Sequence, residues 1–298
     1  MPPFNRRAFT QGPHLPSRLE PTSTVLVSLD GTRAGRQALA WATAEAAARG
    51  GTLSIVRSVA SSHLAAGPWL WAYQPGFAEM EYFAGREDLA EASEQAHAID
   101  SSLAVSTDLL PGTLGSTVLR NGTTDALIVV GRRRRMGQVL DLELSATWGA
   151  FNRGPGAIAL VDLTDACHAG PSTGRVVLAL DAAGDPSMVI ASAFRAAMRR
   201  CAGITLLHTL GHGAVGEVVD EVLAPYRTVF PEVGVRTRAV KSLTRAVREE
   251  SHGAALTVVA APESARDIVG RVRALRLVRA AGGPVTVVSQ ARAQTDVR

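Results

Sequence analysis

The 298-residue chain is long enough for two domains of ordinary size, and its 46% hydrophobic residues suit helices packed on buried strands. Its 31 Lys and Arg residues nearly balance its 27 Asp and Glu residues, so the net charge of +4 gives no indication of nucleic-acid binding. No apolar stretch approaches the roughly 18 residues of a membrane span, and the N-terminus lacks the apolar segment of a secretion signal. Cys167 and Cys201 form neither a disulfide framework nor a closely spaced metal or redox motif. We therefore expect a cytoplasmic protein that binds neither membrane nor nucleic acid.

The first elements along the chain predict a β-α-β unit. Residues 1–22 are rich in proline and show no apolar periodicity, which indicates a flexible tail. A short aliphatic run then ends at Asp30 and Gly31. A helix-like segment follows at Arg36–Arg49, and a second aliphatic run covers Leu53–Val56. Strand, helix and strand in this order form the repeating unit of α/β proteins.

The same unit recurs in the second half of the chain. It comprises the strand Val176–Asp181, the helix-like segment Ser187–Arg200 and the strand Ile204–Leu207. Asp181 follows Asp30 by 181 − 30 = 151 residues, and Ile204 follows Leu53 by 204 − 53 = 151 residues. A constant offset of this kind indicates an internal duplication.

Two later strands repeat as well, at a shorter offset. Leu127–Gly131 matches Leu256–Ala260, and 256 − 127 = 129, so the second copy lacks 151 − 129 = 22 residues in its middle. Ile158–Val161 matches Val285–Val288, each after a Gly/Pro turn, and these last strands should lie at sheet edges. Apolar strands without polar alternation, separated by helices, indicate a parallel sheet covered on both faces. We predict α/β architecture with two tandem doubly wound domains, each a mainly parallel five-stranded sheet with helices on both faces.

The repeats also predict where the chain divides. Polar, Gly and Pro residues cluster between residues 162 and 174, which indicates a linker. We assign residues 23–162 to the first domain, 163–174 to the linker, 175–291 to the second domain and 292–298 to a further tail.

The 22 additional residues of the first half fall between about Ser58 and Ser101. They include a helix-like segment at 78–98 and the aromatic residues Trp69, Trp71 and Tyr73. The aromatic residues could form a lid or a partner surface, but a hydrophobic plug under a loop is the commoner explanation for such residues.

The first candidate for a ligand contact is Asp30. Ligands of a doubly wound sheet bind beyond the carboxyl ends of the strands, at the point where the strand order reverses. Asp30 ends the first strand beside Gly31 and Thr32, where its carboxylate can accept hydrogen bonds from a ribose or a base amino group. The structural alternative is that Asp30 caps the following helix.

The second candidate is the segment after the strand Leu127–Val130. Gly131 directly follows this strand, and Ser145 and Thr147 stand at the opening of a later helix-like segment. Backbone N–H groups and hydroxyls can converge on an anion at a helix N-terminus, so the arrangement suits phosphate binding. The sequence carries neither a Walker A pattern nor a dinucleotide glycine fingerprint.

These features resemble a universal stress protein domain, twice over, between residues 24 and 290. The resemblance rests on the strand ending Asp30-Gly31-Thr32, the Ile-Val-Val-Gly strand ending at Gly131, the following Ser-x-Thr segment and the Pro-containing turn before the last strand. It implies stress-associated regulation through adenine-nucleotide occupancy or protein contacts, without a defined reaction. It also implies that the last strands pair, so that the two domains pack as a pseudo-dimer. For ATP or another adenine nucleotide, the candidate residues are Ser28, Asp30, Gly131, Arg132, Gly137, Ser145 and Thr147.

The phosphate-loop pattern of that family is only half kept. Its ATP-binding members carry Gly, two residues, Gly, nine residues, Gly and then Ser or Thr. Gly131 and Ser145 match this pattern, whereas Arg134 and Leu144 replace the second and third glycines. A side chain at either place adds strain or blocks a phosphate, so we expect weak binding. The run Arg132–Arg135 could offset this loss by neutralising phosphate charge, or could be a solvated basic loop.

The second half departs further from the pattern. Ala260, Pro262 and Glu263 stand where the glycine loop should be, and a carboxylate there would repel phosphate. We therefore expect the second domain to be structural or to bind a partner.

The helix-like segment Arg266–Arg279 is amphipathic. It places Ile268, Val272 and Leu275 on one face with arginines around them, which predicts a core helix with a basic solvent face.

Three functions stay open at this point. The first is the nucleotide-dependent regulator, with a regulatory protein partner and further self-association among its expected contacts. The second is a slow ATPase, which would need a positioned base and usually a metal site, and no motif places Asp30 or Asp141 for this. The third is a pure interaction module without any ligand. We expect no enzyme and no metal site.

Overall fold

The computed structural model describes residues 24–59, 77–111, 126–132, 156–162, 174–181, 185–209, 215–262 and 267–289. The first half contains β1 (Thr24–Leu29), α1 (Arg33–Arg49), β2 (Thr52–Val59), α2 (Phe77–Ile99), β3 (Val105–Pro111), β4 (Leu127–Arg132) and β5 (Ala157–Asp162). The second half contains β6 (Val176–Leu180), α5 (Ser187–Arg199), β7 (Ile204–His208), α6 (Val215–Val229), β8 (Val235–Ala239), α7 (Leu243–Glu250), β9 (Leu256–Ala260), α8 (Ile268–Ala280) and β10 (Val285–Val288).

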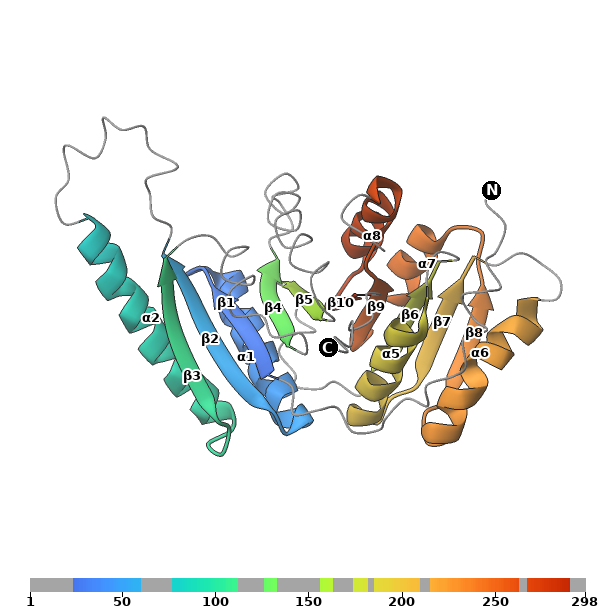
Figure 1. Ribbon diagram of the computed structural model, residues 1–298, viewed down its shortest axis with the longest axis horizontal. Coiled ribbons are helices and arrows are strands. Elements are labelled where there is room, and N and C mark those ends of the chain that lie inside the picture. The colour runs from blue at the N-terminus through green and yellow to red at the C-terminus, as the bar shows by residue number, and fades with distance from the viewer. Residues whose placement is uncertain are drawn as a thin grey trace, which may run out of the picture.

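The strands form one continuous sheet in the order β3-β2-β1-β4-β5-β10-β9-β6-β7-β8 (Figure 1). Within each half all neighbouring strands are parallel, and both halves follow the doubly wound order 3-2-1-4-5. The halves meet at β5 and β10, which pair antiparallel. The predicted fold class is therefore confirmed, and the two last strands pair as expected.

The register of the strands repeats with the offset seen in the sequence. Val25 pairs with Leu53 in the first half, and Val176 pairs with Ile204 in the second. The strands β3 and β8 were not recognised in the sequence, and their register shows where the extra residues of the first half lie. Leu53 pairs with Val105 and Ile204 pairs with Val235, so the offset at the third strand is 235 − 105 = 130. Hence 151 − 130 = 21 of the 22 extra residues lie between β2 and β3, as expected.

Several predicted segments lie outside the described residues. They are the two tails, most of the linker (163–173) and the aromatic residues Trp69, Trp71 and Tyr73. The domain limits stay predictions.

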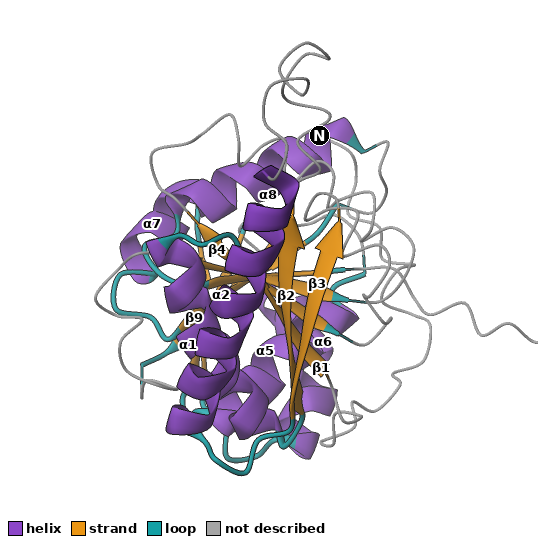
Figure 2. Cartoon of the chain, turned by 90° about the vertical axis from the view of Figure 1, so that its left-hand side faces the viewer, coloured by secondary structure: helices purple, strands orange, loops and turns teal. Residues whose placement is uncertain are grey.

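Helices cover both faces of the sheet. On one face, Val25, Val27 and Leu29 of β1 pack with residues of α1 and α2, while the equivalent strand residues of the second half pack with α5 and α6. On the other face, an apolar cluster combines α7 and α8 with strand residues of both halves, Leu26 and Ile158 among them. Figure 2 views the molecule from its α2 end, with α2 in front beside β2 and β3. The core is therefore shared by the two halves.

A buried ionic cluster joins α1 to the end of α5. The carboxylate of Glu45 accepts hydrogen bonds from Arg49 at 2.8 Å, from Arg199 at 3.0 Å and from Arg200 at 2.6 Å. Glu45 is 3% exposed, and the guanidinium of Arg200 lies 6.0 Å from the ring centroid of Trp41, which packs against the cores of both halves. Burial alone would raise the pKa of Glu45, but Arg200, Arg49 and Arg199 outweigh it and lower the pKa to about 2. Glu45 therefore stays ionised and links the halves.

The helices α1 and α5 end in the same way, with one difference. Gly50 ends α1 at φ +60°, and its equivalent by the offset of 151 is Cys201, at φ +48°. Gly51 donates to the carbonyl of Ala46 at 3.0 Å, and Ala202 donates to that of Ala197 at 2.9 Å. Both are Schellman motifs, in which glycine is the preferred residue at the left-handed position. Cys201 holds that conformation at a steric cost of about 1–2 kcal/mol.

We expect Cys201→Gly to raise the free energy of unfolding by about 0.5–1 kcal/mol, because relief of the strain exceeds the added entropy of the unfolded chain. The matched reverse change is Gly50→Ala, whose new Cβ would have no atom of the described residues within 4 Å and which should destabilise by a similar amount. Urea unfolding of both variants measures the two effects. Opposite signs are expected, and destabilisation by Cys201→Gly would contradict the assignment of strain.

The helix α8 presents a different face to the core than the sequence predicted. Its buried residues are Ala274, Leu277, Val278 and Ala280. Ile268 is 69% exposed and Val272 is 42% exposed, while Leu275 only packs partly against the core. The expectation that these three residues form the core face was wrong for Ile268 and Val272. In the described residues, no helix is both long enough and apolar enough to cross a membrane.

Candidate functional site

The candidate site lies where the strand order reverses in the first half. β1 pairs with β2 on one side and β4 on the other, so the chain leaves β1 in one direction and returns later in the other. Asp30 directly follows β1 and is exposed at this point. This is where ligands bind in doubly wound sheets. Asp181 follows β6 at the equivalent position of the second half, as the repeat predicted.

The carboxylate of Asp30 is oriented by the turn into α1. Its Oδ1 accepts hydrogen bonds from the backbone N–H of Thr32 at 3.0 Å and from the Thr32 hydroxyl at 2.5 Å. The hydroxyl oxygen of Thr32 in turn accepts from the N–H of Gly35 at 3.2 Å, so Thr32 is the N-cap of α1. The residue that caps α1 is therefore Thr32, not Asp30. Asp30 holds Thr32 in place through these two hydrogen bonds.

Gly131 is required by the close approach of α1 to the end of β4. A Cβ at this position would lie 2.4 Å from the carbonyl carbon and oxygen of Ala34 and 2.8 Å from the nitrogen of Gly35. A Cβ on Gly35 would in turn lie 2.7 Å from Oδ1 of Asp30. Asp30 and Gly131 thus both contact the first turn of α1. The structure brings these two predicted residues to the same turn. Gly131 is also explained by packing, because a side chain there would collide with α1.

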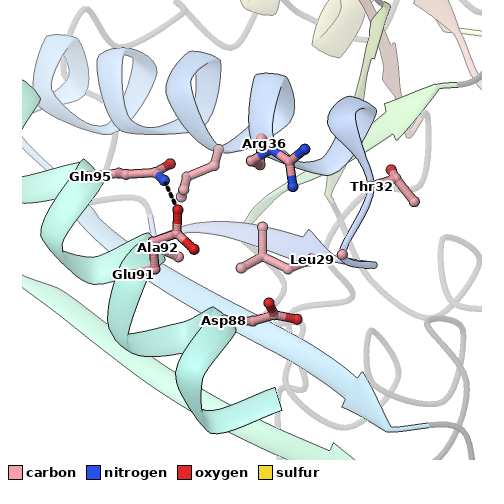
Figure 3. A pocket seen from close by; sticks show the side chains of 9 residues that line it. Leu29, Thr32, Arg36, Asp88, Glu91, Ala92 and Gln95 are labelled. Carbon is pink, nitrogen blue, oxygen red and sulfur yellow. Dashed lines mark hydrogen bonds between the residues drawn. The ribbon is translucent and has the colours of Figure 1, made fainter. Parts of the chain in front are cut away.

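A hollow opens between α1 and α2 at the carboxyl end of β1, and its lining includes Leu29 and Gly31, the chain neighbours of Asp30 (Figure 3). About 330 Å³ of empty space lies within it, open solvent included, so it is a depression open to solvent. Its lining includes Leu29 and Gly31 and five polar residues, Thr32, Arg36, Asp88, Glu91 and Gln95. The carboxylates of Asp88 and Glu91 can accept hydrogen bonds from hydroxyl or amino groups and would repel a phosphate. The polar lining of the hollow therefore offers acceptors to the donor groups of a ligand.

Arg57 holds one wall of the hollow in place, a role that the sequence reasoning missed. Its Nε donates to Oδ2 of Asp88 at 3.1 Å, and its Nη1 donates to the carbonyl oxygen of Leu29 at 3.4 Å. It thereby ties α2 to the end of β1. The sequence shows only that Arg57 directly follows the aliphatic run Leu53–Val56, and the structure pairs it with Leu29 next to the reversal point. Asp88 could not be placed without the packing of α2.

Arg132 does not lie where the resemblance placed it. The side chain is 3% exposed, and its guanidinium donates to the backbone carbonyls of Val278, at 2.5 Å, and of Ala281, at 3.3 Å. These carbonyls end α8 in the second half, where a cation also meets the negative end of the helix dipole. Arg132 joins the two halves, and we do not retain it as a phosphate ligand.

The remaining predicted residues divide into two groups. Ser28 is buried, and because strand residues alternate it shares the face of Leu26, opposite to Leu29 in the hollow. Gly137, Ser145 and Thr147 lie outside the described residues, as do the replacements Arg134 and Leu144.

The equivalent position of the second half is arranged differently. Both carboxylate oxygens of Asp181 accept from Arg273 of α8, at 3.0 and 3.3 Å. The residue that occupies the place of Arg57 is His208, which is 6% exposed and whose Nδ1 has no hydrogen-bond partner among the described residues. Burial lowers the pKa of His208. Among the described residues, the second half thus has a histidine in place of the arginine that holds the hollow, and its aspartate is paired with an arginine.

Comparison with known proteins supports the fold. No protein-family model matches the sequence, and none of the curated proteins is detectably similar to it. Among solved structures, a universal stress protein from Archaeoglobus fulgidus superposes with a TM-score of 0.71 over 92% of this chain and 98% of its own, at 13% identity. A functionally unknown protein from Pseudomonas aeruginosa gives 0.57 over 91% and 94% at 14% identity. The cytoplasmic domain of a prokaryotic cation chloride cotransporter gives 0.56 over 90% and 95% at 10% identity.

These likenesses extend over both halves of the chain. The protein therefore has the fold of a universal stress protein, as the resemblance in the sequence implied. At these identities the likeness concerns the fold, and function has to be argued from the site.

Proposed function

We propose that the protein is a stress-response regulator of the universal stress protein type whose first half binds an adenine nucleotide weakly. The observation that carries the proposal is the exposed carboxylate of Asp30 at the reversal point of the sheet, beside a polar hollow. We further propose that the protein acts in the cytoplasm and through nucleotide occupancy rather than through catalysis.

The chemistry of the hollow favours one orientation of the nucleotide. Ribose hydroxyls and the adenine amino group are donors, so they suit the carboxylates of Asp30, Asp88 and Glu91. The same carboxylates disfavour phosphates, which we therefore place beyond Gly131, toward the predicted residues Gly137, Ser145 and Thr147. With Arg132 committed to α8, the phosphates lose one candidate cation, which is a further reason to expect weak binding.

The position of Arg132 also favours the second candidate function, an interaction module without nucleotide. A candidate phosphate ligand is used instead to hold the two halves together, at the end of α8. The two candidates differ in one measurable property, the affinity for ATP.

We expect Asp30→Ala to lower the affinity for ATP by tenfold or more, because the loss of a charged acceptor costs roughly 1.5–3 kcal/mol. Isothermal titration calorimetry of the intact chain measures the change. Asp181→Ala is the matched control in the second half, where the carboxylate pairs with Arg273, and should leave the affinity unchanged. Asp30→Asn keeps an acceptor for Thr32, so it separates loss of charge from loss of the turn. Equal losses in both alanine variants would place a site in each half, and no binding by the unmodified protein would leave the interaction module.

A further inference from the structure

Two helices on the surface of this protein carry opposite charge. The helix α2 contains six acidic residues and one arginine, a charge of 1 − 6 = −5 with His97 neutral. The helix α8 contains four arginines and no acidic residue, a charge of +4. Because both are solvent-facing on one side, each presents a field of a single sign.

Each of these helices also exposes large apolar side chains. On α2, Met80 is 69% exposed and Phe83 is 64% exposed. On α8, Ile268 is 69%, Val269 59% and Val272 42% exposed. These are most of the large hydrophobic side chains that the described residues leave in solvent. Apolar groups gathered beside charges of one sign are typical of a contact surface.

The apolar and charged groups follow each other in the same order on both helices. On α2 the exposed Phe83 is followed four residues later by Glu87 and then by Glu94. On α8 the exposed Val272 is followed four residues later by Arg276. Residues four apart lie on one face of a helix, so each helix carries an apolar end and a charged end on its outer face. Two such helices lying parallel would match apolar to apolar and Glu87 to Arg276.

These charges are available for such a contact. Within the part of the chain that the structure describes, Glu87, Glu94 and Arg276 form no ion pair. The two helices cannot meet within one chain, because α2 packs on β2, β3 and α1, whereas α8 packs on α7 and β9. Figure 1 shows them far apart. The complementary surface must come from a second molecule.

We propose that the outer face of α2 in one copy docks along the outer face of α8 in a second copy of this chain. The α2 surface consists of Met80, Phe83, Glu87 and Glu94, and the α8 surface of Ile268, Val269, Val272 and Arg276. Contact between two different surfaces propagates into a chain or ring of copies, unless both contacts form reciprocally in a dimer. The contact is small, so it forms at high protein concentration and weakens with salt. It does not depend on nucleotide binding.

Charge reversal on each helix tests the proposal. Sedimentation velocity of the intact chain, over a range of protein concentrations at low salt, should show a mass that rises above the monomer. Glu87→Arg and Arg276→Glu should each weaken association by about fivefold or more, because an attractive contact becomes repulsive. The double variant Glu87→Arg/Arg276→Glu restores opposite charges and should recover the association. Arg236→Glu on β8 changes the net charge as Arg276→Glu does, but away from both helices, and should have no effect on association.

The outcomes separate this contact from others. All substituted side chains are exposed, so thermal unfolding should be unchanged and a loss of association reports the contact itself. A protein that stays monomeric at every concentration would overturn the proposal, as would association that neither single reversal weakens. Recovery that fails in the double variant would also overturn it. So would a monomer whose α8 surface binds phosphatidylserine-containing vesicles instead.

Discussion

Replacing Glu45 by glutamine should cost the protein about 3–5 kcal/mol of its free energy of unfolding, the largest loss we expect from a single substitution. The side chains of Glu45 and Arg200 are each 2% exposed, so glutamine would leave guanidinium groups buried without a counter-charge. The cluster joins α1 to α5, and its loss should weaken the contact between the two halves. Urea or thermal unfolding of the variant gives the measurement.

The exposed pair Arg245–Glu249 provides the matched control. Both side chains are more than half exposed, at 82% and 52%, and lie four residues apart on α7. Glu249→Gln should therefore change stability by no more than about 0.5 kcal/mol. If Glu45→Gln costs no more than this control, the buried cluster does not hold the halves together.

The same cluster predicts how stability depends on pH. The pKa of Glu45 falls from 4.5 to about 2 on folding, so the folded state holds its proton less tightly than the unfolded state. Its contribution is complete above pH 4.5 and is lost as the pH falls toward 2, in total about 3 kcal/mol. Glu45→Gln should remove this part of the acid dependence, which unfolding measured across that pH range will show.

The second large effect is expected at Gly131. Gly131→Ala would place a Cβ 2.4 Å from backbone atoms of Ala34, so β4 or the first turn of α1 must move. A clash with backbone cannot be relieved by a rotamer change, and we expect a loss of about 2–3 kcal/mol. Thermal or urea unfolding measures it.

Gly234 is the control for this substitution. A Cβ there would meet no atom of the described residues within 4 Å, and its backbone φ is not positive, so Gly234→Ala should be nearly neutral. If Gly131→Ala is as stable as Gly234→Ala, the glycine is not explained by packing against α1.

The fold could be predicted from the sequence because its signals are local and repeated. Aliphatic strands such as Val25–Leu29 and Val176–Leu180 stand at a constant offset, and the structure pairs them in the same register. The strands β3 and β8 were missed because they lie at the outer edges of the sheet. Their exposed residues, such as Arg236 and Thr107, interrupt the apolar pattern that marks a buried strand.

The candidate site could be predicted only in part. Asp30 and Gly131 follow directly from strand ends, and the structure brings them against the same turn of α1. Arg132 follows Gly131 in the sequence, but its direction depends on the antiparallel pairing of β5 with β10, which brings α8 near β4. Neither the partner of Arg132 nor that of Arg57 can be read from local sequence, because both depend on packing between distant elements.

The face of α8 shows a related limit. Its periodic positions Ile268, Val272 and Leu275 suggested a core face, yet the helix is buried through Ala274, Leu277 and Val278. Periodicity identifies an amphipathic helix, but two apolar stripes on one helix leave open which of them faces the sheet. The stripe left in solvent includes Ile268 and Val272, which belong to the proposed contact surface of α8.

Native mass spectrometry of the intact chain with added ATP tests the central claim most directly, because it counts the nucleotides bound to each molecule. We expect one nucleotide per chain, held by the first half, with occupancy strongly reduced in Asp30→Ala and unchanged in Asp181→Ala. Two nucleotides per chain would show that the second half also binds. A chain that carries none at ATP concentrations up to the millimolar range would contradict the nucleotide-dependent function.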